Sequence, residues 1–363
     1  WGNEPWSQEE MELNEALVEE AAEKNEYAIV ILARTAGEDK DNKMLEGAYC
    51  LTSIEEDMLQ KVRKSFAKMI VLLNTGNIMD MSFMDQYRPD AVMYVWQGGM
   101  IGGLGTVDVL TGKVCPSGRL SDTIAAQMSD YPADPYFGGL EQNLYVEDIY
   151  VGYRYFETIP GAREKVNYPF GFGLSYTTFE VKTLEAGENH GNIQVRVQVT
   201  NTGSCAGKEV VQIYVGKPQG KLGKPDKELV AFEKTRLLQA GESQLLLLQW
   251  KVSDMASFDD LGKVRKAAYV LEKGTYVIYA GTSVRDVEKL SYSYVLEEDV
   301  ITEQLATKLA PTSLKKRMLA DGTFEELPLM QANDPNASEI GKLKDEQTDG
   351  FTPTMMNDIK AAD

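Results

Sequence analysis

Acidic side chains gather in residues 34–42, which read RTAGEDKDN and directly follow an apolar run. Gly37 allows the backbone to turn sharply and to present the Glu38 carboxyl outward. General acid catalysis of glycoside cleavage needs a carboxyl near the leaving oxygen, with its pKa raised by burial or by neighbouring negative charge. Asp39 and Asp41 could supply that charge. From spacing alone, a solvated polar loop is the simpler interpretation, because loops at strand ends are usually polar.

Helix and strand patterns alternate over the part of the chain that would position this loop. Short continuous apolar runs, typical of strands buried on both faces of a sheet, occur at residues 27–33, 69–73 and 91–95. Capping-box patterns at residues 7–10 and 53–56 predict helices that end near residues 24 and 66. This alternation predicts a parallel sheet covered by helices, whose active groups gather at the carboxyl ends of the strands. Residues 34–42 lie at such an end.

The hydrophobic period changes in the second half of the chain. Residues 193–200 (IQVRVQVT) alternate apolar and polar side chains strictly, as in a half-buried antiparallel strand. Similar short patterns follow at residues 209–215, 245–250, 274–280 and 290–295. Together they predict a two-sheet sandwich. The period fades near residue 297, and residues 331–349 have the polar composition of an exposed linker.

The remaining chemical motifs argue against a cofactor or a metal. The glycine-rich turn at residues 96–105 fails the dinucleotide fingerprint, because Asp108 stands where the third glycine belongs. His190 is the one histidine and has no partner for a triad or a zinc site. The cysteines, Cys50, Cys115 and Cys205, show no metal or redox spacing. We therefore expect no cofactor and no metal site.

Residues 145–156 (YVEDIYVGYRYF) combine aromatic rings with two carboxylates, Glu147 and Asp148. Sugars stack on aromatic faces, so one interpretation of this stretch is a substrate contact. Aromatic side chains also dominate cores and interfaces, however, and we expect this stretch to pack between domains. Glu147 and Asp148 are therefore secondary candidates for the site.

The composition restricts the partners and the compartment. A formal net charge of −19 disfavours nucleic acid and anionic membranes. No apolar run approaches the roughly 18 residues of a membrane span. Three widely spaced cysteines argue against a disulfide framework and favour a reducing, cytoplasmic compartment. The chain begins at Trp1 without a methionine or a signal-peptide pattern, so we expect an excised or truncated N-terminus.

Residues 167–176 (NYPFGFGLSY) place two glycines among aromatic rings, just before the all-β pattern. The backbone must pack closely under the rings there, as at a domain junction. This stretch resembles the junction between the second and third domains of glycoside hydrolase family 3, the β-glucosidase family. Other motifs that resemble the family, in the family's order, are the Gly37–Glu38 loop, PSGRL at 116–120, VGYRY at 151–155 and KEVVQIYV at 208–215.

The resemblance implies three parts: an α/β domain with a helix-covered, mainly parallel sheet over residues 1–172, its N-terminal portion missing; an all-β fibronectin type III-like sandwich over 173–297; and an acidic tail or linker over 298–363. It also implies a retaining β-glucosidase-like hydrolase of terminal nonreducing β-linked sugars. Glu38 would be the general acid/base, and a (β/α)8 barrel outside this chain would supply the nucleophile. Asn42 departs from the arginine that the family often has near the end of this loop.

The alternative is a non-catalytic carbohydrate-binding or scaffolding module. The intact loop around Glu38 argues against it, since a scaffold has no need of a poised acid. For the hydrolase, the expected partners are a β-glucoside or oligosaccharide and the barrel domain, with no nucleic acid and no membrane.

Overall fold

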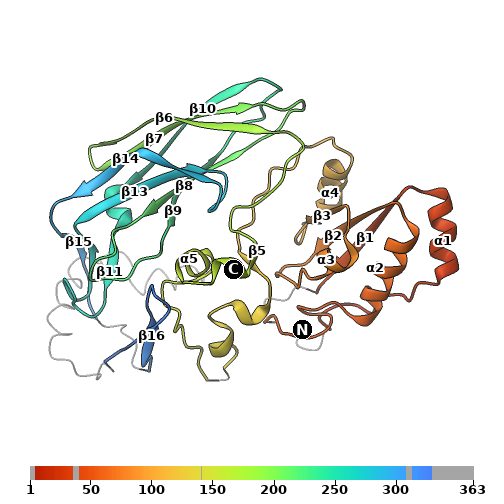
Figure 1. Cartoon of the computed structure of the whole chain (residues 1–363), viewed down its shortest axis with the longest axis horizontal. Coiled ribbons are helices and arrows are strands. Elements are labelled where there is room, and N and C mark those ends of the chain that lie inside the picture. Colours follow the sequence, from red (N-terminus) through yellow and green to blue (C-terminus); the bar gives the residue numbers. More distant parts are fainter. Residues whose placement is uncertain (1–4, 36–40, 140, 308–312, 329–363) are drawn as a thin grey trace, which may run out of the picture.

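The computed structural model describes residues 5–35, 41–139, 141–307 and 313–328. An α/β part lies at one side of the molecule and an all-β sandwich at the other (Figure 1). The α/β part contains α1 (Glu15–Lys24), β1 (Tyr27–Ala33), α2 (Ser53–Ser65), β2 (Lys68–Asn74), α3 (Phe83–Tyr87), β3 (Ala91–Tyr94) and α4 (Gly102–Leu110). The predicted fold class, a helix-covered parallel sheet followed by a sandwich, is confirmed.

The three strands of the α/β part pair in the order β1-β2-β3, and both pairings are parallel. Alternate side chains of β1 and β2 point to one face, where Val30 and Leu32 join Val71 in a core with Leu59 of α2. Residues of α1 and α3 belong to the same core. The helices α1, α2 and α3 therefore cover one face of the sheet.

The opposite face of β1 differs from the expectation of a strand buried on both sides. Tyr27, Ile29 and Ile31 are 57%, 52% and 53% exposed, although each is apolar or aromatic. The register places Ile31 beside Leu72 of β2, which is buried. The outer face is therefore covered over β2 and open over β1.

Both helix starts in this part lie elsewhere than the sequence predicted. The first helix begins at Glu15, where the Asn14 side chain caps it by accepting a hydrogen bond from Ala16 N at 2.8 Å. The predicted start at residue 7 is therefore wrong. In α2 the capping box is formed by Thr52 and Glu55, one residue before the predicted pair.

A connecting region follows α4. It contains β4 (Ile124–Ala125), three short 3₁₀ helices (Met128–Asp130, Asp134–Tyr136 and Arg163–Lys165), α5 (Tyr153–Thr158) and β5 (Val166–Tyr168), which pairs antiparallel with β4. Its aromatic stretch packs against the sandwich, because the Tyr153 ring stacks on Phe170 at 4.6 Å and meets Tyr214 of the sandwich at 6.1 Å.

The sandwich consists of two antiparallel sheets with strand orders β10-β7-β6 and β14-β13-β8-β9. Their bounds are β6 (Phe179–Asn189), β7 (Asn192–Asn201), β8 (Val210–Gly216), β9 (Glu228–Lys234), β10 (Ser243–Lys251), β13 (Gly274–Gly281) and β14 (Val287–Leu296). A 3₁₀ helix (Val252–Met255) follows β10. Every second residue of β7 from Ile193 to Val199 is fully buried. The strict alternation read from the sequence thus corresponds to one face in the core.

Further strands border the sandwich. A third sheet joins β11 (Ser257–Asp259), β12 (Ala268–Leu271) and β15 (Val300–Gln304), and β16 (Lys316–Met318) pairs with β17 (Phe324–Glu326). The stretch after residue 297, which the sequence suggested as tail or linker, therefore begins with paired strands. They are three to five residues long, too short for a clear period.

Side chains from both parts close the junction at residues 167–176. Arg119 bonds to Gly173 O and forms an ion pair with Glu209 of the sandwich. Gln212 of β8 donates to Gly171 O at 3.4 Å and to Thr282 O at 2.6 Å. A Cβ on Gly171 would lie 2.4 Å from Gln212 Oε1. A side chain at residue 171 would therefore collide with the hydrogen-bonded Gln212 where the connecting region meets the sandwich.

Replacing Gly171 by alanine should lower the free energy of unfolding by about 1–3 kcal/mol more than replacing Gly191, because of overpacking against Gln212. Both glycines have left-handed backbones, with φ of 81° and 77°, so the backbone strain is matched. A Cβ on Gly191 would meet open space. Urea denaturation of the two variants measures the difference, and equal losses would contradict the packing at the junction.

Candidate functional site

The predicted acidic loop leaves the carboxyl end of β1. Gly37, Glu38 and Asp39 fall in residues 36–40, outside the described residues, but the chain on both sides of them is described. On the N-terminal side, Arg34 N donates to Asn74 O of β2 at 3.1 Å and Thr35 N donates to Trp6 O at 2.6 Å. The entry to the loop is therefore fixed at the end of the parallel sheet.

Arg34 is buried and uses its guanidinium to join three segments. Its Nε donates to Ala48 O at 2.9 Å, and its two Nη atoms donate to Ala33 O at 2.8 Å and Cys50 O at 3.1 Å. The same Nη atoms bind both carboxylate oxygens of Glu55, at 2.6 and 2.9 Å. This bidentate, charge-assisted pair ties the end of β1 to the returning chain and to α2.

Glu55 also caps the helix in which it lies. Thr52 N donates to Glu55 Oε2 at 2.8 Å, and Glu55 N donates to the Thr52 hydroxyl at 3.1 Å. The carboxylate thus sits in the first turn of α2, where the helix dipole favours negative charge. Both members of the pair are almost completely buried, with side-chain exposures of 5% and 4%.

On the C-terminal side of the loop, Asn42 Nδ2 donates to Ile78 O at 2.8 Å. Ile78 follows the carboxyl end of β2, so residues 36–40 are bracketed by one bond to Asn74, the last residue of β2, and one to the segment that follows β2. Asn42, which departs from the family's arginine, therefore has an anchoring contact of its own. Asp41 beside it is exposed.

Three tyrosines lie near the same end of the sheet. Burial raises the pKa of Tyr94 and that of Tyr131 to about 12, and it is the largest cause of the raised pKa of Tyr49. The Tyr94 hydroxyl accepts a hydrogen bond from Met79 N at 3.2 Å. These phenols therefore stay protonated at neutral pH.

Trp96 was not chosen as a site residue from the sequence, although it follows β3 directly. Its backbone is left-handed, with φ of 53°, and its half-buried ring packs against Tyr94 with centroids 4.7 Å apart. It presents an aromatic surface after the third strand of the sheet. The signal in the sequence that could have identified Trp96 is its position directly before a glycine-rich turn.

The secondary candidates Glu147 and Asp148 form no described contact with residues 34–42. Asp148 pairs with Arg317 at 3.5 Å, and its pKa is raised chiefly by burial, which the guanidinium opposes. Glu147 is buried, and one of its carboxylate oxygens has no partner among the described residues.

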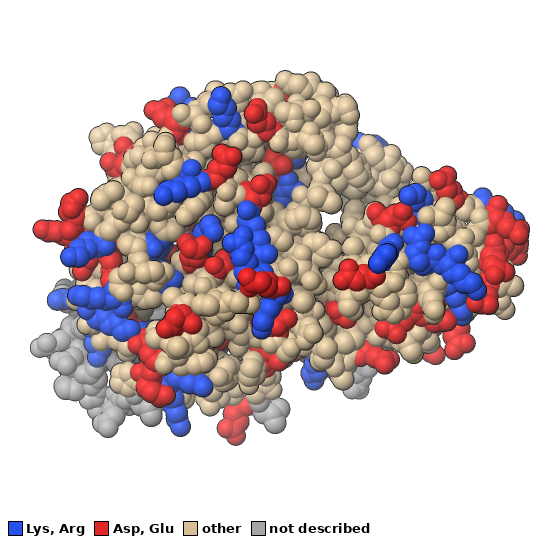
Figure 2. Space-filling model, viewed as in Figure 1, with Lys and Arg blue, Asp and Glu red and all other residues tan. Residues whose placement is uncertain are grey.

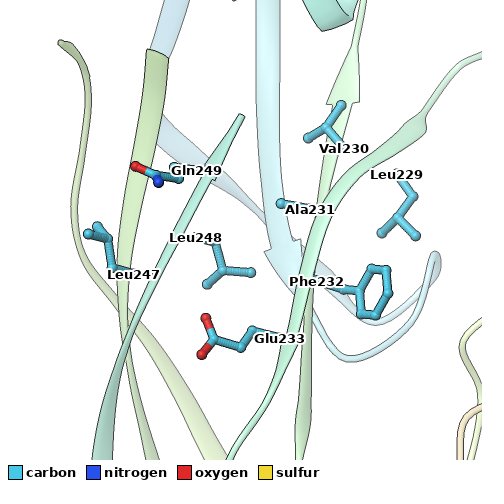
Figure 3. A pocket seen from close by; sticks show the side chains of 8 residues that line it. All are labelled: Leu229, Val230, Ala231, Phe232, Glu233, Leu247, Leu248 and Gln249. Atoms are coloured by element: carbon cyan, nitrogen blue, oxygen red, sulfur yellow. The ribbon is translucent and has the colours of Figure 1, made fainter. Parts of the chain in front are cut away.

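A groove of about 420 Å³ lies elsewhere, between strands β9 and β10 of the sandwich. Figure 3 shows the side chains of Leu248 and Glu233 between the two strands. The lining is mainly apolar and includes one carboxylate, Glu233, so it offers no carboxylate pair for acid/base catalysis.

The described residues contain no group of three or more His, Cys, Asp or Glu side chains that could hold a metal ion. His190 lies exposed in the turn between β6 and β7, and the three cysteines are free. Among the described helices, none combines the length and apolar character needed to cross a membrane. Acidic side chains gather around the α1 end of the molecule, with Lys and Arg between them (Figure 2).

Comparison with known families gives two matches. Residues 8–176 match the glycosyl hydrolase family 3 C-terminal domain, and residues 209–284 match the fibronectin type III-like domain. The two regions correspond to the α/β part with its connecting region and to most of the sandwich.

Individual proteins match over nearly the whole chain. A β-glucosidase of Ruminococcus albus is 48% identical over 347 residues, which cover 94% of this chain and 36% of the relative. β-Glucosidase A of Butyrivibrio fibrisolvens is 45% identical, covering 92% and 45%. The crystal structure of a Paenibacillus barengoltzii β-glucosidase superposes with a TM-score of 0.87 at 46% identity, covering 92% and 38%. The chain thus spans less than half the length of these relatives.

Replacing Glu55 by alanine should lower the free energy of unfolding by about 3–5 kcal/mol, because the charge of Arg34 would stay buried without its partner. Glu20→Ala is the matched control. It removes a carboxylate that pairs with Lys24 at 2.6 Å on an exposed helix surface, and should cost about 0.5 kcal/mol at most. Chemical denaturation of both variants measures the difference, and losses of similar size would contradict the structural role of the buried pair.

Proposed function

This chain belongs to glycosyl hydrolase family 3, and from that premise we propose that it contributes the general acid/base, Glu38, to a retaining β-glucosidase-like enzyme. One observation carries the proposal. Arg34 and Asn42, on either side of Glu38, are both bonded at the carboxyl ends of the parallel strands. A short loop held at both ends limits where its carboxyl can go, which is what positioned acid catalysis requires.

In the proposed reaction, Glu38 donates a proton to the glycosidic oxygen while a carboxylate nucleophile attacks the anomeric carbon. The bond from that carbon to the leaving group breaks, and a glycosyl-enzyme forms. Glu38, now ionised, then accepts a proton from the water that hydrolyses this intermediate. Retention needs the two carboxyl groups about 5–5.5 Å apart.

The nucleophile and most sugar contacts are assigned in this proposal to a (β/α)8 barrel outside the chain. The three relatives described above are β-glucosidases, which supports a terminal β-linked sugar as substrate. Their length is compatible with such a division, because the chain spans 36% to 45% of them. The proposed domains are the α/β domain over residues 1–172, the fibronectin type III-like sandwich over 173–297 and the tail or linker over 298–363. The acid/base belongs to the first of them.

Glu38→Ala should slow hydrolysis of substrates with poor leaving groups by about 10² to 10⁴, the usual worth of general acid catalysis. The test protein is a chimera in which this chain replaces the matched part of the Ruminococcus albus β-glucosidase. Substrates with good leaving groups need no protonation, so their glycosyl-enzyme should still form, and added azide should rescue its breakdown. The measurement is the rate of hydrolysis of two aryl β-glucosides, one with a poor and one with a good leaving group, each with and without azide.

Glu46→Ala is the matched control, since Glu46 is an exposed carboxylate eight positions further along the chain. It should leave both rates within about twofold. If Glu38→Ala lowered the hydrolysis rates of both substrates equally and azide restored neither, the acid/base role of Glu38 would be contradicted. A Glu38→Ala chimera with undiminished turnover would favour the binding-module alternative.

The 363-residue chain by itself should hydrolyse aryl β-glucosides no faster than buffer, since the proposal places the nucleophile elsewhere. Release of nitrophenol from an aryl β-glucoside, followed at high protein concentration, is the measurement. Two results together would refute the proposal that the nucleophile lies outside this chain: sustained turnover by the chain alone, and covalent labelling of one of its residues by a mechanism-based inactivator.

A further inference from the structure

Two of the three cysteines lie at the junction with the sandwich, although they are far apart in the sequence. Cys115 belongs to the chain that leaves α4, and Cys205 lies between β7 and β8. Tyr176 contacts both sulfur atoms, because its N–H donates to Cys115 Sγ at 3.3 Å and its carbonyl oxygen accepts from Cys205 Sγ at 3.1 Å. The two thiols therefore lie against the backbone of one residue.

Other contacts fix the backbone around the two thiols. The Thr177 hydroxyl donates to Asn201 Oδ1 at 2.7 Å, and Asn201 Nδ2 donates to Cys205 O at 2.8 Å. A Cβ on Gly207, two positions after Cys205, would lie 3.4 Å from Cys115 Sγ. The turn that carries Cys205 is therefore held beside the chain that carries Cys115.

The two thiols differ in their access to solvent. Cys205 is exposed, whereas Cys115 is half-buried. A dissolved oxidant therefore reaches Cys205 first, and Cys115 is placed to react with whatever forms there. A disulfide needs its sulfur atoms about 2 Å apart, so both side chains have to leave Tyr176 and rotate toward each other.

We propose that Cys115 and Cys205 are a redox-responsive pair that forms a disulfide across the junction when a small disulfide, such as glutathione disulfide, is the oxidant. The Cys205 thiolate attacks one sulfur of the oxidant, whose S–S bond breaks, and one glutathione leaves as a thiolate. The Cys115 thiolate then attacks the Cys205 sulfur of this mixed disulfide and displaces the second glutathione. The protein thiols lose two electrons and two protons, and the oxidant becomes two thiols.

The bridge would tie the chain after α4 covalently to the sandwich. Its main effect would be on the unfolded chain, which loses conformational freedom when two distant residues are joined. The oxidised protein should therefore resist unfolding more than the reduced one. The pair is independent of any role of Glu38. The spacing of the cysteines in the sequence gave no sign of it, because the fold brings them together.

The test uses the unsubstituted 363-residue chain in mixtures of reduced and oxidised glutathione, quenched with acid and N-ethylmaleimide. Peptide mass spectrometry should find Cys115 joined to Cys205, in an amount that rises with the share of oxidised glutathione and is independent of protein concentration. Cys115→Ser should accumulate at least tenfold more glutathione adduct on Cys205, because the second attack is lost. Cys50→Ser is the matched control and should form the bridge normally, since Cys50 contacts Met44 instead.

Urea denaturation shows whether the native fold accommodates the bridge. The oxidised chain should have a higher midpoint than the reduced chain, a reductant should remove the difference, and Cys115→Ser should show none. Glutathione adducts without a bridge, or bridges formed mainly with Cys50 or between chains, would overturn the proposal. A lower midpoint for the oxidised chain would also overturn it, since the pair would then join only by distorting the fold.

Discussion

A guanidinium buried at the end of β1 determines how the chain leaves the parallel sheet. Burying Arg34 and Glu55 takes two charges out of water, and the cost is compensated only where their hydrogen bonds are complete. Arg34 meets that demand with both oxygens of Glu55 and with three carbonyl groups. The strand end, the returning chain at residues 48–50 and the start of α2 are consequently fixed together.

The same pair explains why the start of α2 could not be read from the sequence alone. Thr52 with Glu55 and Ser53 with Glu56 both fit a capping box. The first one forms because Glu55 is also the partner of Arg34, 21 residues away, while Glu56 has no such partner in the described structure. The local pattern correctly predicts that α2 begins with a capping box. The contact with Arg34 determines which of the two possible boxes forms.

Patterns that depend on neighbours along the chain were more predictable. The alternation in β7 and the apolar runs of β1, β2 and β3 specify their strands directly. The contacts that hold the acidic loop were not visible, because Arg34 to Glu55 and Asn42 to Ile78 each join residues distant in sequence. Glu38 itself is proposed from motif resemblance alone, and it lies outside the described residues. The exposure of β1 was missed because a run of apolar residues does not state which of its faces is covered.

The contacts at the junction with the sandwich restrict where recombination can divide the gene. Its contacts join Arg119 to Glu209 and Gly171 to Gln212, so each bond links the chain between α4 and β6 to the sandwich. A recombination event between residues 119 and 212 would separate these partners and leave buried polar groups unpaired. An exchange outside that interval would carry both parts together, with their relative orientation intact. Residues 119–212 therefore belong to one unit of exchange between genes.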